Sequence, residues 1–337
     1  MRTLPSFLVL SCCAITASGC LRLTLVDASV RKPSNVAVYF SVTDLQKRPV
    51  PSMEATQFKI YEDGKIVSAF ESKQTILNPE VAVVQYTLLL MDMSGSVTAS
   101  GRTGELTEAA SLFAEKVGKT QQVAVYAFDG AKEIHSIAGF QPGGAGLQSA
   151  IGAIQSFNSR DPSTNLNGAV LEGLKILRQH MDRASQPIRV GSLVVFTDGT
   201  DHAHRVPRQT VMDALTHAGN TVNTYVIGVG AEIDHGELSA IGRTATVMYK
   251  DPTAIRRAFD ELAKIVEDYA KSFYLLSYCS PARAGEHELE VEANPPGRGS
   301  GRASMKFNAT GFGPNCDPNT PPSFDLHHPV VTNTATK

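Results

Sequence analysis

The sequence predicts an α/β protein built around a doubly wound, mostly parallel sheet with helices on both faces, plus a small antiparallel β-sandwich. Residues 81–92, VAVVQYTLLLMD, form an uninterrupted apolar run that ends in polar residues, which is typical of a strand buried on both faces. Further apolar runs alternate with amphipathic segments, which predicts repeated strand and helix units. Segments on either side of this region instead alternate apolar with polar residues, as strands of a sandwich do.

The central region, residues 81–270, contains the elements of the parallel sheet. Its helices are predicted where apolar residues recur every three or four positions, and its strands where apolar runs lie between turn residues. Strands are expected at 81–92, 122–128, 134–138, 189–197, 221–229 and 246–249, and helices at 104–119, 146–157, 168–183, 207–218, 234–243 and 254–270.

The flanking segments, residues 36–75 and 272–313, are predicted to pair with each other as antiparallel strands. The strands at the C-terminal side would leave an apolar face uncovered if they stood alone. We therefore expect them to complete a sandwich begun by the N-terminal segment, with the α/β domain inserted between the two. Residues 314–337 are rich in Pro, Thr and Asn and are predicted to be an irregular tail.

The composition of the chain limits the classes of function that it can have. The chain has 337 residues, of which 42% are hydrophobic and 19% are charged, so it can bury a full core. Its net charge of -2 and the pI near 6.5 provide no basic field for nucleic acid or for an anionic membrane surface. We expect no nucleic-acid partner.

The N-terminus has the pattern of an export signal. Arg2 precedes an apolar stretch, and small residues stand directly before Cys20. This arrangement resembles the lipobox of bacterial lipoproteins, in which that cysteine carries the lipid. The interpretation is a signal peptide over residues 1–19 and a lipidated tether over 20–35, with the lipid as the protein's one contact with the membrane. The expected location is the bacterial cell envelope, periplasmic or anchored to the outer membrane, and plain secretion is the alternative.

Cysteine usage fits an oxidising compartment. Of the five cysteines, Cys12 and Cys13 would leave with the signal and Cys20 would carry the lipid. Cys279 and Cys316 remain, and we expect them to form a disulfide. Two free thiols are the alternative, because their distance in space cannot be deduced from the sequence.

Polar loops at the ends of three predicted elements suggest a cation site. They are Asp92 to Ser96 with its two serines, residues 161–164, and Thr197-Asp198-Gly199. Loops of this kind converge at the carboxyl edge of a doubly wound sheet. Carboxylate and hydroxyl oxygens are hard ligands, which suit a small divalent cation such as Mg²⁺.

These three loops resemble the metal-ion-dependent adhesion site of von Willebrand factor type A (VWA) domains, a Rossmann-like fold. The resemblance covers residues 81–270, and the segment 36–70 is also similar to the sandwich segment that precedes this domain in bacterial VWA-related proteins. It implies that Mg²⁺, or Mn²⁺, is held by Asp92, Ser94, Ser96, Thr164 and Asp198. It further implies a non-catalytic adhesion module that binds an Asp or Glu carboxylate of a protein partner.

The same residues allow other interpretations. Ser94 or Ser96 could cap a helix, the Asp198-Gly199 pair could be an ordinary turn, and Ser163 could replace Thr164 as the ligand. Zinc could bind at the sequence Asp-His-Ala-His, residues 201–204, or more weakly at 327–328.

Two other function classes compete with binding. One is a Mg²⁺-dependent phosphotransferase or phosphatase with Asp92 as nucleophile, although Ser94 stands where such an enzyme would carry its second carboxylate. The other is a structural scaffold of the envelope. A serine hydrolase is not indicated, because the sequence has no Gly-x-Ser-x-Gly motif.

Overall fold

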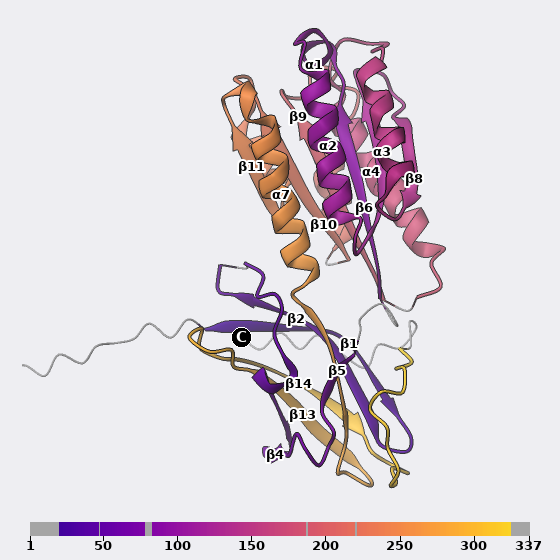
Figure 1. The fold of residues 1–337 in the computed structure, drawn as a ribbon, viewed down its shortest axis with the longest axis vertical. Helices are drawn as coiled ribbons and strands as arrows, with labels where there is room; N and C mark the ends of the chain where they lie inside the picture. Colours follow the sequence, from indigo (N-terminus) through magenta and orange to yellow (C-terminus); the bar gives the residue numbers. More distant parts are fainter. Residues whose placement is uncertain (1–19, 47, 78–82, 187, 220, 325–337) are drawn as a thin grey trace, which may run out of the picture.

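The chain builds one six-stranded sheet and two four-stranded sheets, which Figure 1 shows as an upper and a lower part. The structure is a computed structural model that describes residues 20–46, 48–77, 83–186, 188–219 and 221–324. The predicted signal peptide, residues 1–19, and the histidines at 327–328 lie outside the described residues. Within the described part of the chain, no helix is long and apolar enough to cross a membrane.

The upper part confirms the predicted doubly wound sheet. Its strand order is β11-β10-β9-β6-β7-β8, and every neighbouring pair is parallel except β7 and β8. The strands are β6 (Val83–Asp92), β7 (Gln122–Phe128), β8 (His135–Gln141), β9 (Ile188–Thr197), β10 (Val222–Val229) and β11 (Ala245–Tyr249). All five parallel strands therefore end at the same edge of the sheet, the upper end in Figure 1.

Helices cover both faces of this sheet because the residues of β6 alternate between two apolar cores. Leu89 and Met91 pack in the core beneath α2 (Thr103–Val117), α3 (Ala145–Gly152) and α7 (Ile255–Ala270). Leu88 and Leu90 pack on the opposite side. The helices there are α4 (Leu166–Asp182), α5 (Arg208–Ala218) and α6 (His235–Ile241). A short helix that the sequence did not predict, α1 (Gly95–Ala99), follows β6 directly.

The lower part is a sandwich to which both ends of the chain contribute. One sheet has the order β1-β2-β12-β5 and the other β14-β13-β3-β4, with antiparallel pairing throughout. The strands are β1 (Leu21–Arg31), β2 (Asn35–Asp44), β3 (Phe58–Glu62), β4 (Lys65–Val67), β5 (Thr75–Leu77), β12 (Phe273–Cys279), β13 (Glu286–Ala293) and β14 (Gly301–Asn308). The predicted sandwich of N- and C-terminal strands is thus present.

The predicted tether at residues 20–35 is wrong. Residues Leu21–Arg31 form the edge strand β1, which pairs with β2 along its whole length. Leu21 and Leu23 are buried in the core of the sandwich, and the Leu21 amide donates to the carbonyl of Ser300 at 3.0 Å. Cys20 therefore stands directly against a folded strand.

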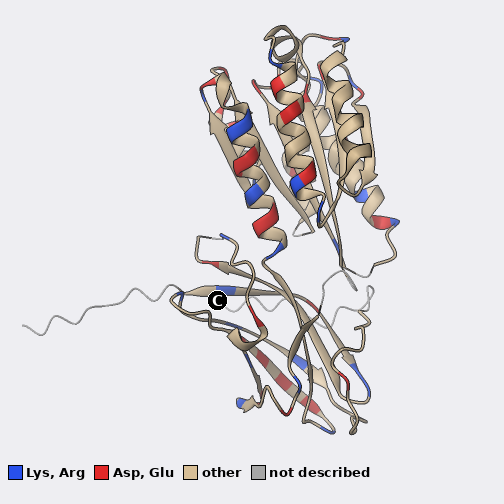
Figure 2. Cartoon of the chain, in the orientation of Figure 1, with Lys and Arg blue, Asp and Glu red and all other residues tan. Residues whose placement is uncertain are grey.

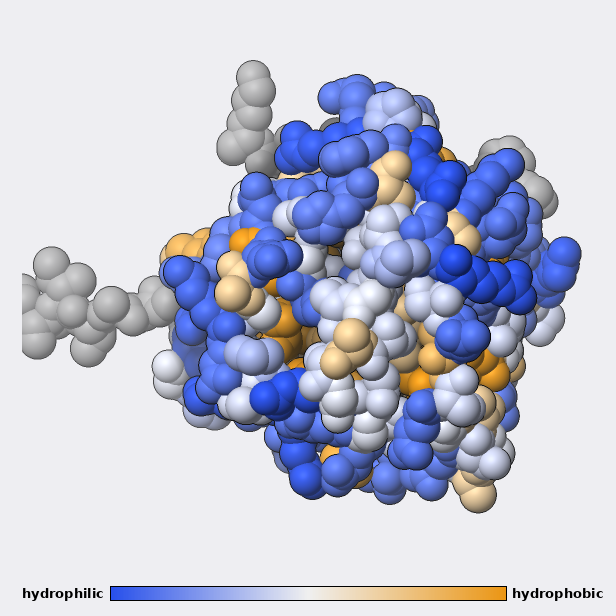
Figure 3. Space-filling model, turned by 90° about the horizontal axis from the view of Figure 1, so that it is seen from above, coloured by the Kyte–Doolittle hydropathy of each residue, from blue (hydrophilic) through white to orange (hydrophobic). Residues whose placement is uncertain are grey.

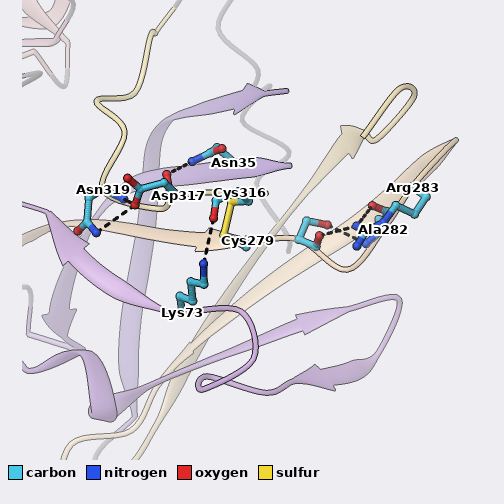
Figure 4. The surroundings of a disulfide bond; sticks show 9 residues. Asn35, Lys73, Cys279, Ala282, Arg283, Cys316, Asp317 and Asn319 are labelled. Atoms are coloured by element: carbon cyan, nitrogen blue, oxygen red, sulfur yellow. Dashed lines mark hydrogen bonds between the residues drawn. A yellow bond between two sulfur atoms is a disulfide. The ribbon is translucent and has the colours of Figure 1, made fainter. Parts of the chain in front are cut away.

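The C-terminal segment has no regular element after β14 up to Phe324, but it is fixed to the sandwich. Cys279 and Cys316 form a disulfide with their Cα atoms 5.7 Å apart, so the expected pair is present. Asn35 donates to the carbonyl of Asp317, and Lys73 donates to that of Cys316 at 3.2 Å (Figure 4). The described part of the predicted tail, residues 314–324, is thus held by covalent and polar contacts.

An apolar cluster joins the two parts. Its members come from the sandwich, from the lower ends of β6 and β9 and from the C-terminal segment: Ala37, Tyr39, Val83, Ile188, Phe273, Leu275 and Phe324. Charged residues of both signs are interspersed over the helices, while β13 carries a row of acids (Figure 2). The carboxyl edge of the parallel sheet lies at the end of the molecule opposite to the sandwich (Figure 1).

Candidate metal centre

Asp92 ends β6 at the carboxyl edge and is fully buried. Its Oδ1 accepts a hydrogen bond from the Ser94 amide at 2.9 Å, and its Oδ2 accepts one from the Thr197 hydroxyl at 2.6 Å. Burial raises the pKa of Asp92 to about 6, although these hydrogen bonds oppose the shift, and the carboxylate of Asp198 raises it further. A cation beside Asp92 would offset the free-energy cost of burying the charged carboxylate.

The two serines that follow present their hydroxyls beside this carboxylate. Ser94 occupies the N-cap position of α1, but its side chain makes no capping hydrogen bond, which argues against the interpretation as a simple helix cap. Its Oγ lies 3.3 Å from the Oγ of Ser96, which donates to Oδ1 of Asp198 at 2.9 Å. Hydrogen bonds therefore connect the first loop with the third.

A glycine lets the second loop approach the first. The Gly95 amide donates to the carbonyl of Pro162 at 2.9 Å. A Cβ atom at Gly95 would lie only 2.8 Å from the Cβ of Pro162, closer than real Cβ contacts come. The absence of a side chain at Gly95 thus allows the loop that carries Thr164 to reach the edge of β6.

Asp129, at the turn after β7, organises the second loop. Its buried carboxylate accepts hydrogen bonds from the backbone amides of Ala131 at 2.8 Å and Arg160 at 2.7 Å. Its own carbonyl accepts from the Asn165 amide at 3.0 Å. The Asp-Gly pair after a buried strand was the one signal in the sequence, and it fits an ordinary turn equally well.

The surroundings of Ser163 and Thr164 distinguish these two candidate ligands. The Ser163 hydroxyl donates to Oδ1 of Asp161 at 2.7 Å, so it is already engaged within its own loop. Thr164 is 3% exposed, and its carbonyl accepts from the Ala203 amide at 2.9 Å, which ties it to the third loop. These contacts favour Thr164 as the candidate.

The third loop carries Asp198 and Thr197. Burial raises the pKa of Asp198, and the carboxylate of Glu232 adds to the shift, while the Ser96 hydroxyl opposes it. Thr197 was not a predicted ligand. Its hydroxyl donates to Asp92 and accepts from the Gly199 amide at 3.2 Å, so it orients the carboxylate of Asp92.

A cavity of about 600 Å³ opens beside these loops, lined among others by Ser96, Thr164 and Asp198. Figure 3 looks onto this end of the molecule. Hydrophilic residues surround a centre of intermediate hydropathy, with apolar residues in the recesses. A partner could approach the candidate ligands from this side.

The donor set suits a hard divalent cation. Two carboxylates and three hydroxyls supply only oxygen atoms, and both carboxylates have raised pKa values. Zinc at Asp201, His202 and His204 is not supported: the described residues contain no group of three or more His, Cys, Asp or Glu side chains that could hold a metal ion. Three of the five candidate ligands are hydroxyl groups. Their site is therefore not one that is made only of His, Cys, Asp and Glu side chains.

The remaining predicted site residues lie elsewhere. Cys20 is a free, exposed cysteine at the start of β1, and the disulfide of Cys279 and Cys316 is in the sandwich. Neither contributes to the cluster of Asp92, Ser96 and Asp198.

Comparison with solved structures finds similar folds at low sequence identity. A von Willebrand factor type A protein from Catenulispora acidiphila is 11% identical, with 88% of this chain and 75% of that chain covered and a TM-score of 0.46. The vWF domain of the type V pili tip protein Mfa5 from Porphyromonas gingivalis is 12% identical, with 55% and 96% covered and a TM-score of 0.41. Proximal thread matrix protein 1 from the mussel byssus, with a zinc-occupied MIDAS motif, is 20% identical, with 60% and 48% covered and a TM-score of 0.40.

The comparison with curated proteins gives no match. Comparison with protein families does give one: the von Willebrand factor type A domain matches residues 88–267, which is more than half of the chain. The match covers most of the parallel sheet and of its helices, and all the candidate ligands. The chain belongs to the von Willebrand factor type A domain family.

Proposed function

We propose that this protein is a binding module of the bacterial cell envelope that holds a protein partner through a divalent cation at the carboxyl edge of its central sheet. Residues 81–270 would form the binding domain, and residues 36–75 with 272–313 the sandwich that carries it. The observation that carries the proposal is the state of Asp92, a fully buried carboxylate whose hydrogen-bond donors are a neutral amide and a neutral hydroxyl.

Asp92, Ser94, Ser96, Thr164 and Asp198 would hold Mg²⁺ or Mn²⁺, directly or through water. The bound cation would supply a Lewis-acidic position for an Asp or Glu carboxylate of the partner. Because three of the five ligands are neutral hydroxyls, they leave much of the cation's charge available to that carboxylate. The cavity lined by Ser96, Thr164 and Asp198 offers the space for a partner side chain.

We propose binding rather than turnover. A phosphotransferase that used Asp92 as nucleophile would need a proton donor near the leaving group, and Ser94 stands two residues on, where a second carboxylate would be required. Hydroxyl groups of ordinary pKa serve poorly as general acids at neutral pH.

Calorimetric titration with Mg²⁺ and Mn²⁺ tests the site. We expect one saturable site per chain, lost in Asp92→Ala and weakened at least about tenfold in Thr164→Ala. Ser163→Ala is the matched control, since its hydroxyl is bound to Asp161, and should bind the cation as the wild type does. Uptake that is unchanged in Asp92→Ala, or equal loss in both hydroxyl variants, would refute the ligand assignment.

A pull-down from envelope extract tests the function. The wild-type protein should retain a partner in Mg²⁺ and release it in EDTA, and Asp92→Ala should retain none. Partner binding that persists in EDTA and in Asp92→Ala would overturn the cation-dependent mechanism.

We also propose that Cys20 is lipidated after removal of residues 1–19. The exposed free thiol of Cys20 and the small residues before it support this proposal. Mass spectrometry of the mature N-terminus should find acyl chains on Cys20, and Cys20→Ala should move the protein from the membrane to the soluble fraction. An unmodified mature N-terminus would favour plain secretion.

A further inference from the structure

A second cavity lies next to the candidate metal centre, on the other side of the loop after β9. It measures about 670 Å³ and is lined among others by Asn167, Asp201, His204 and Glu237. Residues of this loop alternate between the two cavities: Asp198 and His202 line the first, and Asp201 and His204 line the second. Both cavities therefore lie at the carboxyl edge of the sheet.

Two buried acceptors at this cavity have no donor among the described residues. The Asp201 side chain is only 3% exposed; its Oδ1 accepts from the Asn167 amide at 3.1 Å, but its Oδ2 has no hydrogen-bond partner. Oδ1 of the Asn167 side chain, in a residue 4% exposed, has none either. Buried acceptors of this kind carry a cost in free energy unless a donor satisfies them.

The carboxylates that line the cavity also favour a positively charged ligand. Three acidic residues line it, Asp201, Asp234 and Glu237. Burial raises the pKa of Glu237, the carboxylates of Asp201 and Asp234 add to the shift, and Arg208 and His204 oppose it. A cation in the cavity would favour the charged form of Glu237.

The basic residues that line the cavity do not supply the missing hydrogen bonds. The Nδ1 atom of His204 lies 3.7 Å from Oδ2 of Asp201, beyond hydrogen-bond distance, and its side chain is 82% exposed. Arg208 also lines the cavity, but among the described residues no ion pair joins it to these carboxylates. His204 has a φ of +47°, an unusual conformation for a residue other than glycine, so the loop keeps it there against a local preference.

A guanidinium group matches this set of acceptors. It has several N–H donors in a fixed planar arrangement, so one group can reach two acceptors and a neighbouring carboxylate at once. A zinc site is not indicated, since the described residues form no cluster of three or more His, Cys, Asp or Glu side chains that could hold a metal ion. We propose that this cavity is a subsite for an arginine side chain of the protein partner. The inference extends the proposed function, in which the same partner supplies a carboxylate to the cation.

The test uses the full chain in EDTA, so that the metal centre plays no part. Nα-acetyl-arginine methylamide is titrated while NMR follows the ring signals of His204, with the neutral citrulline analogue as the matched probe. We expect a saturable shift with the arginine probe and none with citrulline. Equal shifts with both probes, or no saturable shift with either, would overturn the proposal in favour of a cavity filled by water.

Two variants assign the response to the cavity. Glu237→Gln should weaken binding of the arginine probe about tenfold, because a charge-assisted contact is lost. Glu172→Gln changes a partly exposed glutamate of α4 that does not line the cavity, and should bind like the wild type. Wild-type affinity in Glu237→Gln would refute the assignment.

The outcomes separate this inference from the proposed function. Loss of Mg²⁺ binding with intact arginine binding would overturn the proposed function alone, and the reverse result would overturn the arginine subsite alone. A titration with Zn²⁺ in buffer without EDTA provides the last check. If it shifts the His204 signals in a Glu237-dependent way, the cavity is a metal site and the inference is wrong.

Discussion

Buried carboxylates are treated differently in the two parts of the molecule. In the sandwich, Glu62 accepts a hydrogen bond from the Tyr278 hydroxyl at 2.8 Å, and Glu292 accepts from Tyr61 and from the guanidinium of Arg302, each at 2.8 Å. At the edge of the parallel sheet, Asp92 has an amide and a hydroxyl as hydrogen-bond donors, and its pKa is raised to about 6. The sandwich therefore supplies these two carboxylates with donors from within the chain, whereas Asp92 has a raised pKa despite its two donors, a cost that the proposed cation would offset.

This difference distinguishes carboxylates that stabilise the fold from carboxylates that can bind a cation. A carboxylate with its donors in place stabilises the fold and offers little to a ligand. A buried carboxylate without a cation destabilises the fold, but it binds a cation more strongly because the cation relieves that cost. Substitutions in the sandwich should therefore lower stability, and some substitutions at the sheet edge should raise it.

The largest effect is expected from the disulfide of the sandwich. The double variant Cys279→Ser, Cys316→Ser should lower the free energy of unfolding by about 3 kcal/mol, because the unfolded chain is no longer constrained. Mg²⁺ affinity should stay unchanged, since the disulfide is in the other part of the molecule. The chain has no tryptophan, so chemical denaturation is followed by circular dichroism and tyrosine fluorescence.

A loss of stability below about 1 kcal/mol would show that the non-covalent contacts of Asn35 and Lys73 with the C-terminal segment suffice to hold it. A loss of Mg²⁺ affinity in the same variant would show that the two parts are coupled.

The second prediction is a gain in stability. Asp92→Asn keeps an acceptor for the Ser94 amide and removes the buried charge, so in EDTA near pH 8 it should raise the free energy of unfolding by about 2 kcal/mol. The pKa of Asp92 is raised in the folded state, so the folded wild type retains this proton to a higher pH than the unfolded chain does. Stability of the metal-free wild type should therefore fall from about pH 4 to 6 for this reason, and that of Asp92→Asn should not.

Thermal denaturation of both proteins across this pH range, with and without Mg²⁺, provides the measurement. Added Mg²⁺ should stabilise the wild type and leave Asp92→Asn unchanged. A variant that is less stable than the metal-free wild type near pH 8 would mean that the ionised carboxylate is satisfied without a cation.

Much of the fold follows from the sequence because the parallel strands are buried on both faces. An apolar run bounded by turn residues, such as Gln122–Phe128, predicts a buried strand, and the strand observed there has the predicted bounds. The edge strand β1 escaped prediction for a physical reason. Its register shifts between Leu25 and Asp27, so the alternation of Leu21 and Leu23 does not continue along the strand.

The candidate ligands were predictable as a set because each follows a sheet strand or precedes a helix. The residues that position them were not. The carboxylate of Asp129 accepts from the Arg160 amide, 31 positions away, and the cavity beside Asp201 is lined by residues of three different helices. Such contacts arise only when the chain is folded, and no local pattern encodes them.

The third prediction removes one donor in the sandwich. Tyr278→Phe leaves Oε1 of the buried Glu62 without its hydrogen bond and should cost about 1.5 kcal/mol in the free energy of unfolding. In the double variant Tyr278→Phe, Glu62→Met, both polar partners are gone and much of that loss should be recovered. If the double variant is as unstable as the sum of both single variants, the cost comes from packing and not from the unsatisfied carboxylate.

The smallest expected effect depends on pH and involves exposed groups of the sandwich. The hydrogen bond to Asp63 at 2.7 Å raises the pKa of His287, so its contribution is complete below about pH 6.5 and is lost as the pH rises through the folded value. The Glu288 amide and His287 lower the pKa of Asp63, whose contribution is present above about pH 4 and lost at lower pH. His287→Asn should therefore lower the melting temperature slightly between these limits, and not at pH near 9, where His287 is neutral in both states. The His287 ring also lies against Phe307, with ring centroids 5.7 Å apart, so an equal loss at both pH values would assign its role to packing. That result would mean that the pair of His287 and Asp63 adds nothing to the stability of the sandwich through charge.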